Sequence, residues 1–368
     1  MEILLLIVVL VALILVHELG HFVAAKLSGM RVDEFGIGYP PRAWGIQRGE
    51  TLYSINWLPF GGFVKIYGED LNAPEDAEQN TRSFSAKSHL AQAIVLVAGI
   101  AMNLVFAWII ISGILFAGTP RALESHEIPR AQDATIVIAE IMPGSPAETA
   151  GLNVGDSITQ VIVSPEDTFT GADPAAFTAF IAKDTTKVPL TFDIKREGKQ
   201  MILSAIPATG IVAGDESRVA LGVRVASVGT VPVSWWQAPI VGAQYTWEIT
   251  KQTAVGLAQF FYGIFTFSAD LTQVSGPVGI AGAVGTASKA GFSSLMSLTA
   301  VISINLALIN LIPIPALDGG RLLFVLIETI TRKRIKPMIA TVVNTTGFGL
   351  LVLLMVVVTV HDIWKLVG

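Results

Sequence analysis

The sequence predicts a polytopic α-helical membrane protein of about four transmembrane helices, with an inserted extracytoplasmic β-rich domain. Hydrophobic residues make up 52% of the chain, charged residues 14%, and the mean hydropathy is +0.62. A soluble domain carries roughly 25% charged residues. Four apolar runs reach the length of about 20 residues that a bilayer requires. A stretch between the second and third runs alternates apolar and polar residues, as strands do.

The composition also excludes several classes of function. A net charge of −5 and a pI near 5.6 give no reason to expect nucleic acid as a partner. The chain has no cysteine, which excludes disulfides, thiolate zinc sites and a cysteine nucleophile. Cysteine usage alone does not decide the compartment.

The apolar runs predict spans at residues 3–25, 91–117, 295–316 and 339–360. The first lacks the basic start of a signal peptide and exceeds an h-region in length, so we expect it to be retained. Lys and Arg concentrate in the loops after the first span and between the last two. The positive-inside rule places those loops in the cytoplasm, and both termini outside it.

We expect four parts along the chain: residues 1–117, 118–234, 235–294 and 295–368. The second contains a β-rich module at about 135–207, with a hairpin turn at Glu197-Gly198-Lys199. The third begins with a semi-apolar helix at 235–267, interrupted by Glu248 and Lys251. We interpret it as an interfacial helix with tryptophans near the headgroups, in preference to a fifth span.

The first span contains the sequence HELGH at residues 17–21, where ionisable groups are expensive in lipid. On a helix, His17 and His21 leave one face one turn apart, so both imidazoles can bind one tetrahedral metal ion. Glu18 lies beside them, where it can take a proton from a water that the metal activates. The pattern therefore predicts a catalytic zinc site with Glu18 as the general base.

Two histidines leave a catalytic zinc one protein ligand short. The candidate is Asp318 in NLIPIPALDGGR, which we expect to end the third span. His17 is about 21 Å into a helix that starts outside, and Asp318 also falls in the cytoplasmic part of the bilayer. An aspartate before two glycines is by itself more often a turn residue. Together with the histidines, the metal interpretation is favoured.

These motifs resemble those of the site-2 proteases, the intramembrane zinc metalloproteases whose bacterial branch includes the regulator of sigma-E protease. The resemblance rests on HELGH in the first span, NLIPIPALDGG at the third, and a β-rich insert between spans two and three. It implies hydrolysis of peptide bonds within membrane-embedded substrates. His17, His21 and Asp318 match the family's zinc ligands, and Glu18 matches its general base.

The resemblance also indicates substrate-binding residues. Asn305 and Asn310 match asparagines that line the family's substrate site, although interhelical hydrogen bonding is the alternative. The segments at 35–42 and 53–69 resemble the family's β-structure on the cytoplasmic side, which includes a membrane-dipping β-hairpin or re-entrant loop. The strand-like residues around Phe60, Gly61 and Gly62 offer an edge to which an unwound substrate could pair.

The sequence PGSPAETAGLNVGDSI resembles the PDZ-domain signature, which implies binding of an extended peptide or a chain terminus. GPVGI at 276–280 matches another segment of the site-2 protease family. Two departures are visible. Ala98-Gly99-Ile100 stands where the family has Ala-Gly-Pro, although Asn103 is retained, and only one PDZ-like module is evident where some members have two.

The resemblance implies a multi-pass protein of the bacterial inner membrane that cuts single-pass membrane proteins, in regulated proteolysis or clearance of signal-peptide remnants. One alternative is a non-proteolytic adaptor that binds exported peptides and holds a structural metal. The HELGH sequence argues against it, because a structural site does not need a base at Glu18. A metal-dependent transporter would be expected to show repeat-related halves, and the sequence shows no internal repeat.

Overall fold

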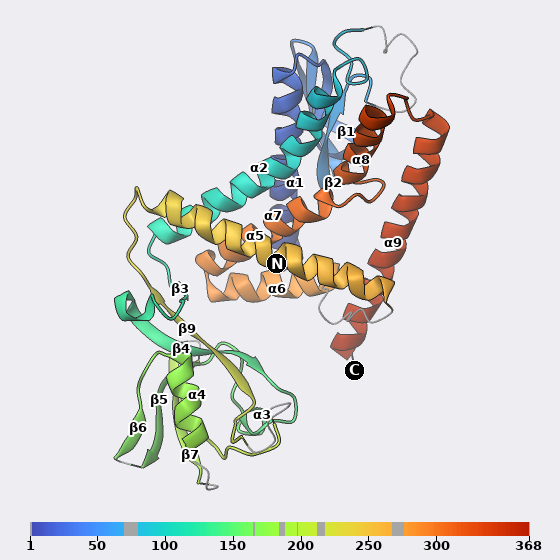
Figure 1. Ribbon diagram of the computed structural model, residues 1–368. Coiled ribbons are helices and arrows are strands. Elements are labelled where there is room, and N and C mark those ends of the chain that lie inside the picture. Colours follow the sequence, from blue (N-terminus) through green and yellow to red (C-terminus); the bar gives the residue numbers. More distant parts are fainter. Residues whose placement is uncertain are drawn as a thin grey trace. The chain divides into compact units, whose positions relative to one another are not determined.

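The computed structural model of the protein describes residues 2–69, 80–164, 166–183, 188–196, 198–211, 218–266 and 276–367. The chain forms two units, one of Met1–Ile114 with Pro239–Gly368 and one of Leu115–Ala238. The first is mainly helical and the second is built around a β-sheet (Figure 1). Each unit is described by itself below.

The helical unit contains the long helices of the described chain: α1 (Glu2–Leu27), α2 (His89–Phe116), α5 (Ala238–Phe265), α6 (Pro277–Ala290), α7 (Phe292–Leu311), α8 (Asp318–Thr331) and α9 (Pro337–Val367). Among the described residues, α1, α2, α7 and α9 are long and apolar enough to cross a membrane. This confirms the four candidate spans that the sequence predicts. The semi-apolar stretch at 235–267 forms α5, which does not meet that criterion.

The third span differs from its prediction. Helix α7 ends at Leu311, and residues 312–317 form a tight reversal before α8 begins at Asp318. Pro313 and Pro315 lie in this reversal, and proline has no N–H with which to continue a helix. The prediction that Asp318 ends the third span is therefore wrong, because Asp318 is the first residue of a separate helix.

A β-hairpin follows α1 and consists of the antiparallel strands β1 (Val32–Arg48) and β2 (Thr51–Ile66). Ile37 of β1 pairs with both Ile55 and Gly62 of β2. The chain of β2 must therefore reverse between these two residues, where the Pro-Phe-Gly-Gly sequence lies. Within the part of the chain that the structure describes, residues 62–66 therefore pair only with β1 and form an edge of this small sheet.

The second unit is a β-sheet with two short helices and a 3₁₀ turn. Its sheet has the order β3-β9-β4-β5-β7-β8, with β6 paired to β5. The elements are β3 (Arg121–Ala122), η2 (Ile128–Arg130), β4 (Gln132–Ile141), α3 (Pro146–Thr149), β5 (Ser157–Ser164), β6 (Asp167–Phe169), α4 (Pro174–Lys183), β7 (Leu190–Arg196), β8 (Lys199–Ala205) and β9 (Val223–Thr230).

The predicted hairpin is confirmed, since Arg196 pairs with Lys199; Glu197 of its turn lies outside the described residues. The predicted boundaries of 135–207 are too narrow for the sheet. Strand β9 lies beyond them and pairs with β4 along most of its length. This pairing joins residues about 90 positions apart, so local alternation of the sequence could not reveal it.

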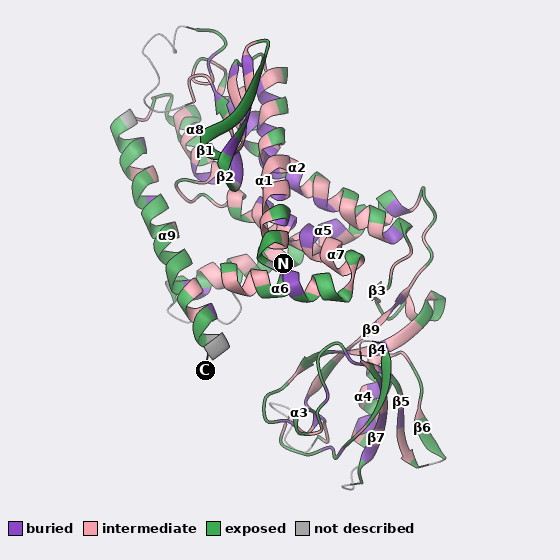
Figure 2. Cartoon of the chain, turned by 180° about the vertical axis from the view of Figure 1, so that it is seen from behind, coloured by how far each residue is buried: buried purple, intermediate pink, exposed green. Residues whose placement is uncertain are grey.

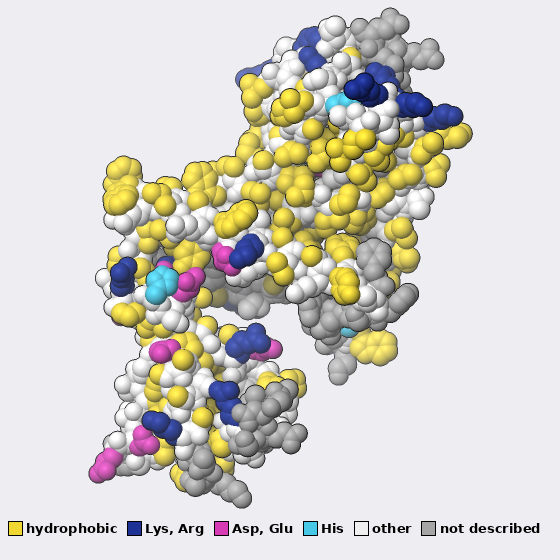
Figure 3. All heavy atoms as spheres, in the orientation of Figure 1, with side chains coloured by type: hydrophobic (Ala, Val, Ile, Leu, Met, Phe, Trp, Pro, Cys, Tyr) yellow, Lys and Arg dark blue, Asp and Glu magenta, His cyan; other side chains and the backbone are white. Residues whose placement is uncertain are grey.

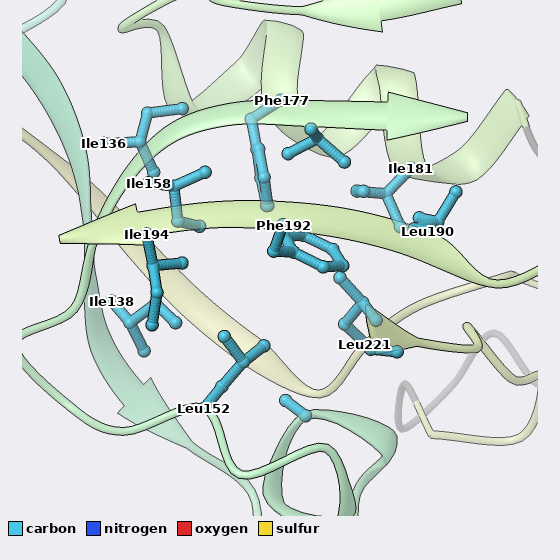
Figure 4. Packing of buried hydrophobic residues seen from close by; sticks show 13 residues of the cluster. Ile136, Ile138, Leu152, Ile158, Phe177, Ile181, Leu190, Phe192, Ile194 and Leu221 are labelled. Atoms are coloured by element: carbon cyan, nitrogen blue, oxygen red, sulfur yellow. The ribbon is translucent and has the colours of Figure 1, made fainter. Parts of the chain in front are cut away.

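The core of the second unit lies between the sheet and α4. Phe192, Leu190 and Ile194 of β7 are fully buried, and Phe177 and Ile181 of α4 cover them. Figure 4 shows the Phe192 ring at the centre of this cluster. The alternating positions of β7 thus point into one hydrophobic core, as expected for a strand with one buried face.

Two smaller clusters fix the helices of the first unit. Ala24 and Ala25 of α1 pack with Val32, Ile66 and Val95, which joins α1, the hairpin and α2. Ala107 of α2 packs with Ala300 and Ile304 of α7 in the second cluster. By contrast, α9 is largely exposed (Figure 2), and only 11% of its apolar window is buried. Its apolar surface suits contact with lipid.

Candidate metal centre

The two histidines of HELGH project from one face of α1 into the interior of the helical unit. His17 and His21 are 7% and 8% exposed, and their ring centroids are 4.7 Å apart at an interplanar angle of 83°. Their Nε2 atoms lie 3.0 Å from each other. The four-residue spacing thus produces the shared position that the sequence predicts.

The first residue of α8 approaches the same point. Asp318 Oδ2 lies 2.9 Å from Nε2 of His17 and 3.2 Å from Nε2 of His21. The structure therefore brings together the three residues that the sequence singled out as ligands, although 301 positions separate Asp318 from His17.

The donor set fits a zinc ion. Zinc binds His nitrogen and carboxylate oxygen at about 2.0–2.2 Å, so tetrahedral ligand atoms are about 3.3–3.5 Å apart. The three observed separations of 2.9, 3.0 and 3.2 Å fall within a few tenths of an ångström of that spacing. Two imidazoles and one carboxylate also leave a fourth position for water or substrate, as catalytic zinc sites do.

Glu18 lies beside the hairpin. The backbone amide of Val64 in β2 interacts with the Glu18 carboxylate. A Cβ atom built on Gly62 would be 3.7 Å from Glu18 Cγ. The edge of the small sheet at residues 62–66 is therefore in contact with the side chain that the sequence predicts to be the general base.

Helix α2 packs directly against both histidine rings. Nδ1 of His21 lies 2.8 Å from the carbonyl oxygen of Val95, so this nitrogen donates a proton and leaves Nε2 available for a metal. A Cβ atom on Gly99 would be 2.4 Å from His21 Nε2 and 2.9 Å from His17 Cε1. Similarly, a Cβ on Gly20 would be 2.3 Å from the carbonyl oxygen of Ala98. Glycines on both helices therefore allow the rings to reach the centre.

Two further glycines place Asp318. A Cβ atom on Gly319 would be 2.3 Å from the carbonyl oxygen of Ile312, and one on Gly320 would be 2.3 Å from that of Ile314. The reversal before α8 is also strained, because Ala316 has a φ of 74°. The side-chain oxygen of Asn344 in α9 accepts a hydrogen bond from its N–H, at 3.3 Å. The Asp-Gly-Gly sequence thus allows α8 to begin directly against the end of α7.

An ion pair links α8 to the hairpin. Arg321, one turn after Asp318, contacts the carboxylate of Glu69, which closely follows β2. The Glu69 side chain is 14% exposed. The helix that carries the third ligand is thereby tied to the sheet that supports Glu18.

The remaining predicted site residues are not part of the ligand cluster. Asn305 is half-buried and its side chain donates to the carbonyl oxygen of Val301 in its own helix, at 2.9 Å. Asn310 is half-buried near the end of α7. Gly61 and Gly62 are buried in β2, whereas the Phe60 side chain is outside what the structure describes. Their predicted contact with substrate stays a prediction.

Sequence reasoning missed the contribution of α2. Val95, Gly99 and Asn103 follow one another at intervals of four and therefore lie on one face of this helix. Val95 contacts His21 through its backbone carbonyl, which every residue type has, so the sequence could not indicate this contact. The sequence did show Gly99 and Asn103, four positions apart in an otherwise apolar span, but only as a match to a family segment and not as neighbours of the histidines.

Apolar helices that enclose two histidines, an aspartate and a neighbouring glutamate define a class: the integral membrane metalloproteases that use zinc. The comparison with protein families narrows this class. Residues 5–354 match the model of peptidase family M50. The chain therefore belongs to this family, the site-2 protease family of zinc metalloproteases, and its cofactor is Zn²⁺.

Individual relatives agree along nearly the whole chain. A Clostridium perfringens protein named as a candidate zinc metalloprotease is 36% identical over 353 residues, 96% of this chain and 95% of the relative. The zinc metalloprotease RasP of Geobacillus kaustophilus is 30% identical over 435 positions, with 98% and 97% covered. RasP of Oceanobacillus iheyensis is 29% identical, with 96% of each chain covered.

Proposed function

We propose that this protein hydrolyses peptide bonds within or near the transmembrane segments of single-pass membrane proteins. In this proposal His17, His21 and Asp318 hold the zinc ion and Glu18 is the general base. The observation that carries it is the convergence of three donor atoms, all within 3.2 Å of one another, two of which lie on an apolar helix beside a glutamate. Such groups rarely lie in a membrane span without a function.

The roles of the residues follow from their positions. When bound, zinc polarises the scissile carbonyl and activates water for attack. Glu18 takes the proton from that water and then gives it to the leaving amine. The Glu18 side chain adjoins Gly62 of the hairpin, so the base lies at the edge where we propose that the substrate binds.

The hairpin edge at residues 62–66 is proposed to bind the substrate backbone. A helical substrate hides its peptide bonds in its own hydrogen bonds, so it must unwind before it is cut. An unwound segment can pair with a free strand edge, and this edge adjoins Glu18. Phe60, Gly61 and Gly62 lie at the start of the edge, where the glycines allow a backbone to approach closely.

Other features of the helical unit suit an apolar substrate. An apolar cavity of about 1010 Å³ is lined by α5, by α9 and by the segment around Pro313 and Pro315 that leads to Asp318. We propose that the substrate helix occupies this space before it unwinds. Asn310 is a candidate donor to the substrate backbone or the developing oxyanion. Asn305 is a candidate only if its side chain leaves the carbonyl of Val301.

We propose that the β-rich unit is a PDZ-like domain that binds an extended peptide or a chain terminus and so screens substrates. Strand β9 pairs with β4 on one side, but β3 pairs only with its Val228 and Gly229. Within the described chain, the first residues of β9 therefore have no strand on their other side, and α4 contacts the same strand. A strand edge beside a helix suits binding by strand addition.

The proposed orientation has both termini and the β-rich unit outside the cytoplasm, in the bacterial inner membrane. Lys and Arg gather at the end of the helical unit that carries the α8–α9 loop (Figure 3). Loops rich in these residues face the cytoplasm. Trp235, Trp236 and Trp247 are 74%, 54% and 69% exposed, which suits an interfacial α5.

The test compares the purified wild-type protein with Glu18→Gln and with the control Glu140→Gln, an exposed carboxylate of the β-rich unit. Zinc content and cleavage of a labelled transmembrane peptide are measured in the same preparations. We expect one zinc per chain in all three and cleavage only by the wild type and the control. If all three bind zinc and Glu18→Gln cleaves as well as the wild type, Glu18 is not the base. If all three bind zinc but none cleaves any helical peptide, the zinc is structural and the adaptor alternative replaces the protease.

A further inference from the structure

The two histidines differ in how their second ring nitrogens are satisfied. A neutral imidazole that gives Nε2 to a metal carries its proton on Nδ1, and that N–H needs an acceptor. His21 has one, the carbonyl oxygen of Val95 at 2.8 Å. No backbone carbonyl among the described residues takes this position for His17, whose Nδ1 faces the side chain of Asn103.

Asn103 is fully buried, and its amide nitrogen Nδ2 lies 3.3 Å from His17 Nδ1. The amide oxygen Oδ1 is also buried, and no described group hydrogen bonds to it. A half-turn of the amide about its last side-chain bond exchanges these two atoms. It brings the unpartnered acceptor to Nδ1 of His17, which requires an acceptor when Nε2 binds a metal.

We propose that Asn103 is a positioning residue of the metal centre. Its Oδ1 accepts the proton of His17 Nδ1 and so holds the tautomer and ring orientation in which Nε2 can bind zinc. The inference rests on the proposed zinc site and deepens it, because it assigns each histidine its own acceptor on α2.

The geometry of α2 supports this assignment. Val95, Gly99 and Asn103 are spaced by four, and His17 and His21 are spaced by four on α1. One face of α2 therefore carries three features in succession. Val95 provides the acceptor for His21, Gly99 the space for both rings, and Asn103 the acceptor for His17.

Asparagine side chains in membrane helices commonly form hydrogen bonds between helices. Here the backbone of Asn103 makes that bond instead. The backbone carbonyl of Asn103, not its side chain, accepts a hydrogen bond from Ser303 Oγ of α7, at 2.8 Å. Ser303 is fully buried, so this bond fixes α2 against the helix that leads to Asp318. The Asn103 side chain is thus left to face His17.

The test measures the zinc dissociation constant of the full-length protein in detergent by competition with a chelator. Asn103→Leu keeps the size of the side chain but removes the acceptor, whereas Asn103→Asp keeps an acceptor. Gln92→Leu is the control, because it removes an amide of α2 whose bond goes to the Lys87 carbonyl. Loss of such a partner typically weakens metal binding by about 10–100-fold. We expect this loss in Asn103→Leu alone, with Asn103→Asp and Gln92→Leu within a few-fold of the wild type.

The possible results separate this inference from the proposed function. If the wild type binds no stoichiometric zinc, the proposed function itself fails. If the wild type binds zinc and folded Asn103→Leu binds it equally well, only the role of Asn103 is refuted. If Asn103→Leu does not fold, the zinc affinity of Asn103→Asp tests the acceptor role instead. An unchanged affinity and an unchanged visible spectrum of its cobalt form support the acceptor role, and a loss of zinc by this folded variant overturns it.

Discussion

At the scale of single residues, the metal centre depends on glycine, which has no side chain, as much as on the ligands. His17 and His21 reach a common point only because Gly99 leaves room for both rings. A methyl group there would be 2.4 Å from the atom of His21 that faces the metal. Because the overlapping atom is the donor Nε2 itself, relieving the overlap must move either this donor atom or α2.

We therefore expect Gly99→Ala to lower zinc affinity at least tenfold and to destabilise the helical unit by about 1–3 kcal/mol, the usual cost of overpacking. Zinc content and thermal unfolding in detergent measure the two effects. Gly113→Ala is the matched control, because a Cβ atom on Gly113 of the same helix meets nothing within 4 Å. If Gly99→Ala keeps its zinc with wild-type affinity, α2 does not constrain the histidines.

The residues of the centre differ in how far sequence could predict them. His17 and His21 follow from a local rule, the four-residue turn of a helix. Asp318 follows only from the need for a third ligand and from the family resemblance, since no periodicity relates it to α1. The supporting contacts of Val95 and Asn103 depend on how α2 sits against α1, and a single sequence does not state that register.

At the scale of elements, the turn between β1 and β2 is ion-paired with the end of α1 and with the segment that precedes α2. Glu50, between β1 and β2, accepts from Lys26 at the end of α1, at 2.8 Å, and from Arg82, which lies before α2, at 2.6 Å. The hydrogen bonds from these two cations lower the pKa of Glu50 from its ordinary 4.5 to about 2. The contacts hold the hairpin beside α1, and so beside Glu18.

The lowered pKa sets the pH range in which Glu50 stabilises the protein. A carboxyl group with a folded pKa below its unfolded value contributes stability above the unfolded pKa and loses it as pH falls through the folded value. We expect Glu50→Gln to lower the Tm by no more than about 2–4 °C at pH 7, because the pair is partly solvated. The difference from the wild type should shrink as pH falls from 4.5 towards 2. Thermal unfolding across this range measures it, with Glu140→Gln as the control; a difference independent of pH would contradict the ion-pair account.

The elements themselves were largely predictable where hydrophobicity is continuous. Helices α1 and α9 include the predicted spans and α2 covers all but the last residue of its span, because long apolar runs leave little choice in a membrane. The third span was extended too far, since the apolar residues continue through Pro313 and Pro315 into the reversal. Hydropathy marks where a chain is apolar, whereas the end of a helix depends on backbone hydrogen bonds.

At the scale of the whole molecule, the two units bury their apolar side chains differently: the β-rich unit has one closed hydrophobic core, and the helical unit has two small buried clusters. The β-rich unit closes its own core around Phe192, with polar residues alternating outwards along β7. The helical unit has only small buried clusters, and much of its apolar surface is exposed, as in α9. The sequence predicted this division, but not that β9 returns to pair with β4 near one end of the sheet, because strand order is a property of the folded chain.

The core of the β-rich unit shares no residue with the buried clusters of the helical unit. We therefore expect that the β-rich unit can be destabilised without disturbing the metal centre. Phe192→Ala should cost about 3–5 kcal/mol in the β-rich unit, because the ring is fully buried among aliphatic side chains. We expect calorimetry in detergent to show one transition shifted to lower temperature and zinc content unchanged. Phe292→Ala, at a 76% exposed position of α7, is the control that changes the same side chain without opening a cavity. If Phe192→Ala also releases zinc at temperatures where the helices remain folded, the two units do not fold independently. The β-rich unit would then be part of what assembles the active site.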